Sequence, residues 1–128
     1  MLYVKTKVRP STIEGLGLFA DEFIAKGALI AQFNPRFGWQ CTEAEREALP
    51  PIAKEFLWRY GWRNTDGIWL MDVDDSRFMN HSETPNMKVT LEAGFTSRAV
   101  RDIEPGEELT EDYRDFDPDF EKYGAKWK

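Results

Sequence analysis

From residue 106 to residue 113 the chain reads Gly-Glu-Glu-Leu-Thr-Glu-Asp-Tyr, and this stretch decides how the rest of the 128 residues is interpreted. Two earlier segments accompany it, Gly15-Leu16-Gly17 and Arg77-Phe78-Met79-Asn80-His81-Ser82. Each segment alone is a weak signal, because a bare glycine-x-glycine is common. Their order and spacing within one short chain are far more specific than any one of them.

The two glycines of the first segment suit a loop that approaches a ligand closely. Gly15 and Gly17 lack side chains, so a ligand can reach the backbone and the chain can adopt positive φ. An ordinary turn would carry the same pair, and an isolated pair would favour that interpretation. Only the presence of the other two segments favours a ligand loop.

The three segments, with Pro85 and Asn86 after the second, resemble the signature blocks of the SET-domain protein-lysine methyltransferases. The intervening residues extend the resemblance, namely Ala99, Arg101, Asp102, Ile103 and Pro105. It implies a mainly β fold of the β-clip type with short helices and a C-terminal pseudoknot, in which one segment is threaded beneath a loop. It also implies an enzyme that moves a methyl group from S-adenosylmethionine to a lysine side chain of another protein.

The resemblance assigns roles to individual residues. It places the amino-acid end of the cofactor at the Gly15 loop and Asn80, and the adenine at the backbone of His81. The residues implied to bind the cofactor are Gly15, Leu16, Gly17, Arg77, Phe78, Asn80 and His81. No metal is expected, because His81 is the only histidine and Cys41 the only cysteine. Asn86 is expected to satisfy buried backbone groups, since its amide offers both donors and an acceptor.

Tyr113 is the candidate catalytic residue. Methyl transfer to an amine is an in-line displacement, in which positioning can lower much of the barrier. A phenol oxygen near a sulfonium places negative partial charge beside a positive donor, and it can orient the amine. The amine must arrive unprotonated, and an apolar channel lowers the lysine pKa from about 10.4 in water. By resemblance Tyr113 and Phe33 line this channel, although a core phenylalanine would look the same as Phe33.

The spacing of apolar residues predicts short strands around one helical insertion. Strands are expected at residues 3–8, 28–33, 68–71, 87–91 and 95–99, with the last two joined as a hairpin. From Thr42 to Tyr60 the pattern becomes helical, and Thr42 with Glu45 has capping-box spacing. Pro50 and Pro51 should divide this segment into two helices. Length and apolar content predict a single domain over residues 1–128.

The C-terminal tail, residues 114–128, departs from many members of the family. Those members close the substrate channel with a zinc-bound cysteine cluster after the last signature block, which a chain with only Cys41 cannot build. In this respect the chain resembles the small single-domain form of the family. Asp117-Pro118 is a workable helix start, and aromatic residues follow at helical spacing, namely Phe120, Tyr123 and Trp127. The tail is expected to pack as a helix on the core, with a lid over the site as the alternative.

Composition limits the classes of partner. The chain has 17 Lys and Arg against 23 Asp and Glu, a formal charge of −6. This charge argues against nucleic acid binding and favours a basic protein or peptide substrate, such as a histone or a ribosomal protein. The first residues do not resemble a signal peptide, and no apolar run approaches the roughly 20 residues that cross a bilayer. We therefore expect a soluble cytoplasmic protein that does not bind membranes. The sequence does not predict the oligomeric state, and a dimer is one option.

Two alternatives compete with this interpretation. A SET fold that has lost turnover would still bind a basic peptide. Four polar residues fall at calcium-loop positions one, three, five and twelve, namely Asp72, Asp74, Ser76 and Glu83. Position six is Arg77, where the sharp turn needs glycine, which argues against calcium. Finally, Glu111 stands where many relatives carry the phenylalanine or tyrosine that sets the number of methyl groups, so the sequence predicts no methylation state.

Overall fold

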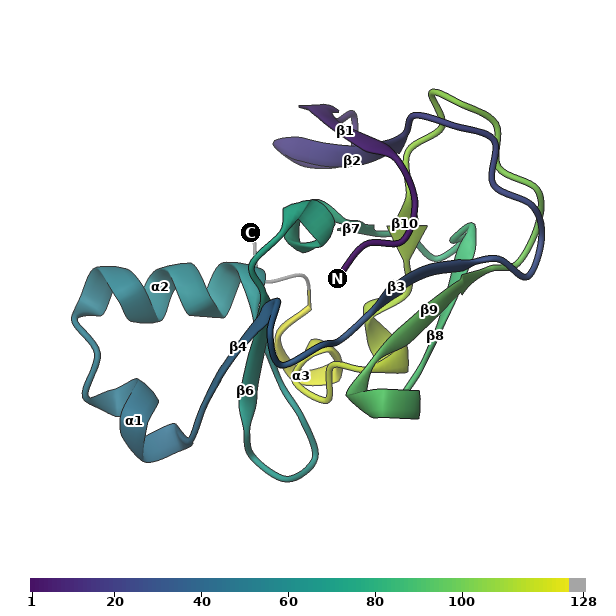
Figure 1. Ribbon diagram of the computed structural model, residues 1–128. Coiled ribbons are helices and arrows are strands. Elements are labelled where there is room, and N and C mark those ends of the chain that lie inside the picture. Colours follow the sequence, from purple (N-terminus) through teal and green to yellow (C-terminus); the bar gives the residue numbers. More distant parts are fainter. Residues whose placement is uncertain (125–128) are drawn as a thin grey trace.

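The strands form four small sheets in the computed structural model, which describes residues 1–124 (Figure 1). The first sheet is an antiparallel pair, β1 (Thr6–Pro10) and β2 (Leu16–Ala20). The second has the order β3 (Leu29–Gln32), β9 (Thr96–Ala99), β8 (Met87–Thr90). The third has the order β4 (Gly38–Cys41), β6 (Trp69–Asp72), β5 (Trp62–Arg63). The predicted mainly β fold with short helices is confirmed.

The fourth sheet joins two segments of the C-terminal half of the chain. Its strands, β7 (Asn80–His81) and β10 (Thr110–Glu111), run parallel, so segments thirty residues apart lie side by side. Asn86 extends this contact, because its amide nitrogen donates to the Glu108 carbonyl at 2.8 Å and its oxygen accepts from the Thr110 N–H at 3.0 Å. The expected role of Asn86 is confirmed, because both hydrogen bonds satisfy backbone groups of the paired segment.

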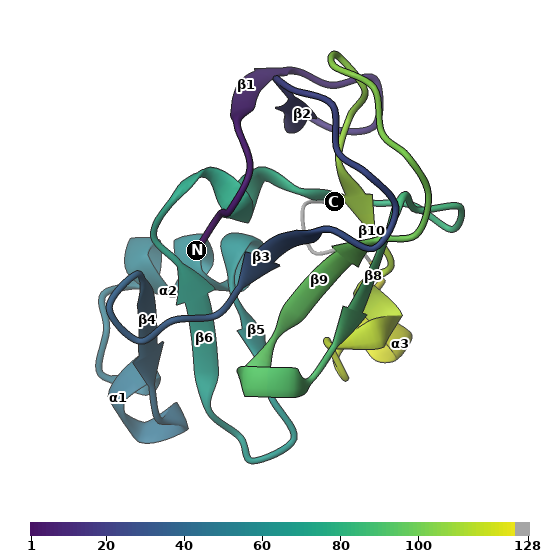
Figure 2. The same cartoon turned by 45° about the vertical axis from the view of Figure 1, so that its right-hand side comes forward.

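The helical insertion lies on one side of the molecule, beside β4 and β6 (Figures 1 and 2). It consists of α1 (Glu43–Glu47) and α2 (Pro51–Tyr60). The Thr42 hydroxyl accepts from the Glu45 N–H at 3.1 Å and the Glu45 carboxylate accepts from the Thr42 N–H at 3.0 Å, which is the predicted capping box. Pro51 is the first residue of α2, where a missing N–H costs nothing, so the proline pair divides the helices as expected.

The predicted hairpin also forms, whereas the first strand was predicted too early in the chain. β8 and β9 pair from Met87 with Ala99 to Thr90 with Thr96. Strand β1 covers residues 6–10 and not 3–8, because the residues before it pair elsewhere: the Tyr3 N–H donates to the Ile30 carbonyl at 2.9 Å. Alternating residues signal a strand but do not say which neighbour it joins.

The described part of the tail, residues 114–124, packs on the core, but its helix starts later than predicted. α3 (Phe120–Tyr123) follows Asp119, while the Asp117 carboxylate accepts from the Asp119 N–H at 3.0 Å in a preceding turn. Phe116, just ahead of this turn, packs against the Trp62 and Phe95 rings at centroid distances of 5.4 and 5.1 Å. Trp127, part of the predicted tail helix, lies outside the described residues.

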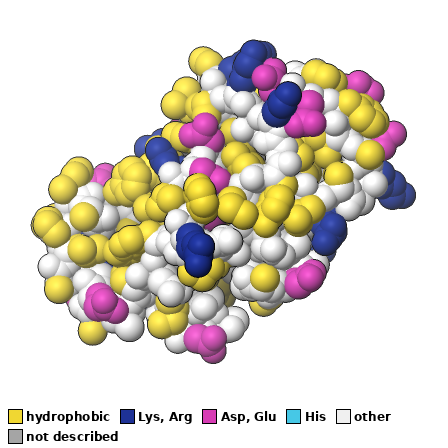
Figure 3. Space-filling view, viewed as in Figure 1, with side chains coloured by type: hydrophobic (Ala, Val, Ile, Leu, Met, Phe, Trp, Pro, Cys, Tyr) yellow, Lys and Arg dark blue, Asp and Glu magenta, His cyan; other side chains and the backbone are white. Residues whose placement is uncertain are grey.

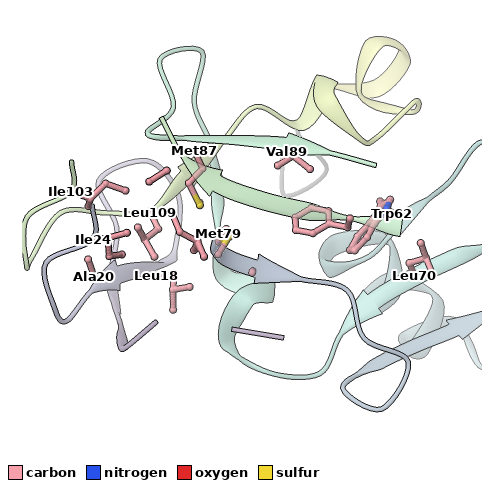
Figure 4. Packing of buried hydrophobic residues seen from close by; sticks show 14 residues of the cluster. Leu18, Ala20, Ile24, Trp62, Leu70, Met79, Met87, Val89, Ile103 and Leu109 are labelled. Carbon is pink, nitrogen blue, oxygen red and sulfur yellow. The ribbon is translucent and has the colours of Figure 1, made fainter. Parts of the chain in front are cut away.

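The larger of two apolar clusters connects the first, second and third sheets (Figure 4). Its largest fully buried members are Leu18, Ile24, Ile30, Met87, Ile103 and Leu109. Each such side chain stabilises the fold by about 1.5–3 kcal/mol through burial. Trp62 and Leu70 lie at the far end of the cluster, toward the insertion. The loops that carry the signature residues are therefore anchored to a packed core.

The insertion also leaves an apolar surface exposed. Ile52 and Phe56 on α2 are 74% and 46% exposed, and they line a groove with Trp39, Met71 and Val73. Hydrophobic side chains gather over this part of the molecule in Figure 3, on its left. A second small cluster, formed by Cys41, Leu57 and Trp69, packs beneath α2. Within residues 1–124, no helix is long and apolar enough to span a bilayer.

Candidate active site

Asn80, the first residue of β7, connects the glycine loop at residues 15–17 to the paired strands β7 and β10. Its amide nitrogen lies 3.3 Å from the Glu14 carbonyl and 3.2 Å from the Leu16 carbonyl, and it donates to both. The Glu108 carboxylate accepts from the same nitrogen at 3.3 Å. Asn80 is 3% exposed. Two segments that are 64 residues apart in sequence are thus held together by one side chain.

The two glycines of the loop serve different needs. Gly15 has φ of +43°, a left-handed conformation that favours glycine, and its carbonyl accepts from the Ser11 N–H at 2.8 Å. Gly17 is buried in β2, and a Cβ on it would lie 1.8 Å from the Glu108 carboxylate. Gly15 therefore shapes the loop, while Gly17 admits the Glu108 side chain that contacts Asn80.

A pocket of about 240 Å³, which we call the loop pocket, opens beside the glycine loop. It is lined by Glu14, Gly15, Leu16, Arg59, Tyr60, Arg77, Phe78, Met79, Asn80 and Tyr113. Five of the seven residues expected at the cofactor line it, whereas Gly17 and His81 do not. Arg59 and Tyr60 were not anticipated, because α2 carries them into the site from the helical insertion. Their sequence spacing signalled only an amphipathic helix.

His81 supports the catalytic candidate from the other side. Its Nδ1 accepts from the Tyr113 backbone N–H at 3.1 Å, and its ring lies 4.5 Å from the Phe120 ring, between centroids. Asp112 is nearby, with a carboxylate oxygen 3.8 Å from Nδ1. The Arg114 guanidinium holds the pKa of Asp112 below its ordinary value, so this carboxylate stays ionised. The imidazole side chain therefore positions the backbone of Tyr113.

Tyr113 lies between two pockets and is held by hydrogen bonds at both ends. Its hydroxyl donates to the Met79 carbonyl at 2.6 Å, while its N–H donates to His81. Burial, reinforced by the nearby Glu111 carboxyl, raises the pKa of the phenol above its ordinary value. The hydroxyl accordingly keeps its proton, and its oxygen is fixed in position.

The second pocket, which we call the aromatic pocket, lies on the other side of Tyr113. Its aromatic lining is Tyr60, Trp62, Phe95, Tyr113 and Phe116. The Trp62 and Phe95 centroids are 5.3 Å apart, and the Tyr113 and Phe116 centroids are 5.6 Å apart. Tyr113, Met79 and three other residues line both pockets, so the two spaces meet at the tyrosine.

Phe33, the expected wall of the substrate channel, is not brought to either pocket. Its ring covers Gly38, where an added Cβ would lie 2.2 Å from it, and its N–H donates to the Phe95 carbonyl at 2.8 Å. Besides Tyr60 and Tyr113, the aromatic lining includes Trp62 and Phe95, which sequence reasoning missed, and Phe116 from the tail that it offered as a lid. The last three belong to a short strand, a strand end and the tail, and only the packing of the tail onto the sheets brings them together.

Two buried carboxyl groups also line the aromatic pocket. Asp72 is 4% exposed and lies 3.6 Å from the N-terminal amine. Glu111 is 5% exposed, and no described residue donates a hydrogen bond to its Oε2. Burial raises the pKa of both groups, and for Glu111 the negative charges of Asp72 and Asp115 add to the effect. The position two residues before Tyr113 thus holds a buried acid.

The residues proposed for a calcium loop have other partners. Asp74 accepts from the Leu2 N–H at 2.8 Å and the Ser76 N–H at 3.1 Å, capping a short 3₁₀ turn. Among residues 1–124 there is no group of three or more His, Cys, Asp or Glu side chains that could hold a metal ion. The chemistry available at the site is therefore that of a phenol, carboxyl groups, guanidinium groups and aromatic walls.

Comparison with known proteins finds a family model that matches all of these site segments. The family model described as SET domain matches residues 15–114, which span the glycine loop, the Asn80 segment and Tyr113. A Plasmodium falciparum protein assigned as a histone methyltransferase has a similar structure, with a TM-score of 0.61 and 20% identity. The match covers 88% of this chain and 95% of that one. No curated protein sequence matches the chain.

Similar structures also occur within a much larger assembly. The Polycomb Repressive Complex 2 of Chaetomium thermophilum, as a humanized mutant bound to the inhibitor GSK126, matches with a TM-score of 0.65 and 25% identity. An autoinhibited form of ctPRC2 bound to S-adenosylmethionine matches with a TM-score of 0.65 and 27% identity. Both matches cover 93% of this chain but only 16% of the other, so this chain corresponds to a small part of those proteins.

Proposed function

The chain belongs to the SET domain family, and from this premise we propose that it transfers a methyl group from S-adenosylmethionine to a lysine amine of a protein. Support comes from two similar structures: one is of a protein assigned as a histone methyltransferase, and the other, of ctPRC2, is bound to S-adenosylmethionine. The formal charge of −6 further supports a basic protein or peptide as the substrate.

The meeting of two pockets at Tyr113 is the observation that carries the proposal. Transfer between two substrates requires each to have its own space and the reacting atoms to meet at one point. Both pockets carry charged groups of both signs, but only the aromatic pocket is also walled by the rings of Trp62, Phe95 and Phe116. We assign the first to the cofactor and the second to the lysine side chain.

The residues of the loop pocket fit the amino-acid end of the cofactor. Arg59 and Arg77 are donors that suit a carboxylate, and backbone carbonyls near Gly15 together with Glu14 suit an ammonium. Gly15 lets the backbone approach a ligand without a side chain. When bound, S-adenosylmethionine would supply a methyl group activated by a sulfonium. We propose that Gly15, Leu16, Gly17, Arg77, Phe78, Asn80 and His81 form its binding segment, with Arg59 and Tyr60 as additional residues.

The residues of the aromatic pocket would shield the lysine side chain from water and orient its amine. Rings of Trp62, Phe95 and Phe116 exclude water and accept the long apolar stem of the side chain. Tyr113 would place its oxygen beside the amine, at an orientation set by the hydrogen bond to Met79. Because the phenol keeps its proton, its role is to orient and to stabilise charge, and it does not act as a base.

A labelling experiment tests the proposal. The protein is incubated with S-adenosylmethionine carrying a labelled methyl group and with a protein extract, and labelled bands are identified by mass spectrometry. We expect label on a lysine of a basic protein, together with calorimetric binding of the cofactor that a chelator leaves unchanged. Label confined to a residue other than lysine, or no binding of the cofactor, would contradict the proposal. The matched control is the Tyr113→Phe variant.

A further inference from the structure

The Glu111 carboxyl group is unusual in its surroundings. It is 5% exposed, it lines the aromatic pocket beside Tyr113, and no described residue donates a hydrogen bond to its Oε2. Leaving a buried polar atom without a partner destabilises the fold, so we look for a partner that enters the pocket from outside. Under the function proposed above, the group that enters this pocket is a lysine ammonium.

We propose that Glu111 is a catalytic residue that takes the proton from the substrate ammonium. This inference rests on the proposed function and assigns a proton acceptor to it. The incoming N–H bond breaks, its electron pair stays on nitrogen, and an O–H bond forms at the carboxylate of Glu111. The amine is then neutral with a free pair. The carboxylic acid returns its proton to solvent after the product leaves.

The surroundings of Glu111 favour this transfer. Burial raises the pKa of the carboxyl group and lowers that of a lysine that enters the same pocket. The two values therefore move toward each other, and exchange of the proton converts a buried ion pair into two neutral groups. A buried ion pair pays a desolvation cost that two neutral groups avoid.

The charged groups that face Glu111 also affect whether its carboxyl group is ionised. Asp72 on β6 and Asp115 in the turn after Tyr113 oppose its ionisation. The N-terminal amine lies 3.6 Å from Asp72 and offsets part of that charge. Arg59, Arg77 and Asp117 line the same pocket. A lysine ammonium adds a positive charge that favours the ionised carboxylate at the moment it is needed.

The pH dependence of kcat/KM tests the role of Glu111. The wild type and Glu111→Gln are compared on a lysine peptide cut from the protein that the labelling experiment identifies. In the wild type, kcat/KM should rise with pH as Glu111 ionises and then level off. In Glu111→Gln the levelling should disappear, and kcat/KM should rise by about tenfold per pH unit toward the lysine pKa, because only free amine reacts. Near neutral pH the variant should be slower by about 100-fold.

A matched variant and two further measurements separate the possible failures. Glu107→Gln makes the same chemical change four residues earlier, in a carboxylate that pairs with Arg101 at the surface, and its pH profile should match the wild type. Calorimetry and thermal unfolding should show that Glu111→Gln is folded and binds the cofactor as the wild type does. An unchanged pH profile in that folded variant overturns the role of Glu111. If the wild type methylates no lysine, the proposed function itself fails, and the proton acceptor with it.

Discussion

Tyr113 shows how much a single residue depends on residues far from it in sequence. Its hydroxyl is held by the Met79 carbonyl and its backbone by His81, both from the segment that β10 locks in place. The same hydrogen bonds hold the tyrosine where the two pockets meet. A group preorganised in this way can stabilise a transition state without rearrangement.

Removal of the Tyr113 hydroxyl should therefore impair turnover more than binding. We expect Tyr113→Phe to lower kcat by about 100-fold or more, the scale seen when one preorganised polar group is lost. Cofactor affinity, measured by calorimetry, should change little because the ring and the loop pocket remain. Full turnover in this variant would make Tyr113 a packing residue.

Asn80 should influence both cofactor binding and stability. Replacement by alanine removes the donor to the Glu14 and Leu16 carbonyls and loosens the glycine loop. We expect Asn80→Ala to weaken S-adenosylmethionine binding by about 1–3 kcal/mol, with a loss of stability of similar size. Calorimetry and urea unfolding measure the two effects. An unaltered cofactor affinity in a folded variant would remove Asn80 from the binding site.

Glu111 should destabilise the fold above its ordinary pKa of 4.5. Because burial raises its pKa, the folded state binds more protons than the unfolded state between 4.5 and the raised value. Stability contributed by this group thus increases as pH falls through that window. Glu111→Gln should be more stable than the wild type at neutral pH, and this difference should shrink toward pH 4.5. Asp72, whose pKa is raised, and Asp74, whose pKa is lowered, are present in both proteins. Because Asp72 and Glu111 interact, the difference between the two urea unfolding curves reports Glu111 together with its coupling to Asp72.

At the scale of elements, the site is assembled from pieces that are individually small. β7 and β10 have two residues each, which is too short to be stable as an isolated pair. Asn86 supplements them with two hydrogen bonds to the backbone of residues 108 and 110. The helical insertion contributes Arg59 and Tyr60 from the last turn of α2. The pockets therefore depend on the pairing of these elements.

Loss of the Asn86 side chain should weaken the pairing of β7 with β10. Both partners are backbone groups that would remain buried and unpaired, so we expect Asn86→Ala to lower the free energy of unfolding by about 2–4 kcal/mol. Asn34→Ala is the control, since the Asn34 oxygen accepts an exposed hydrogen bond from the Arg36 N–H, and it should cost much less. Urea unfolding at a single pH compares them. Equal losses of unfolding free energy in the two variants would show that the pairing of β7 with β10 does not depend on Asn86.

At the scale of the whole molecule, charge should affect encounter with the substrate. The formal charge of −6 attracts a basic peptide over distances that salt shortens. We expect kcat/KM on a lysine-rich peptide to fall as sodium chloride is raised, while kcat stays nearly constant. Identical kcat/KM values at low and high salt would remove electrostatic attraction and leave the catalytic assignment unaffected.

The sequence by itself determined the family, the fold class and most local structure. Thr42 and Glu45 cap a helix, Pro50 and Pro51 divide two helices, and the turn at Glu92–Gly94 joins β8 to β9. Each acts on its immediate neighbours, so its effect could be predicted from the local sequence. The glycine loop and the Asn80 segment were identified because blocks of residues keep their order and spacing. These are properties of the chain before it folds.

Only the tertiary structure decided which side chains share a pocket. Phe33 covers Gly38, while Trp62, Phe95 and Phe116 form the aromatic wall, because sheet pairing and the packing of the tail choose among aromatic residues that look alike in sequence. The surroundings of Glu111 were equally hidden, since burial and the nearness of Asp72 arise from contacts between segments far apart in the chain. Spacing along a sequence specifies local geometry, whereas a site is built from non-local contacts.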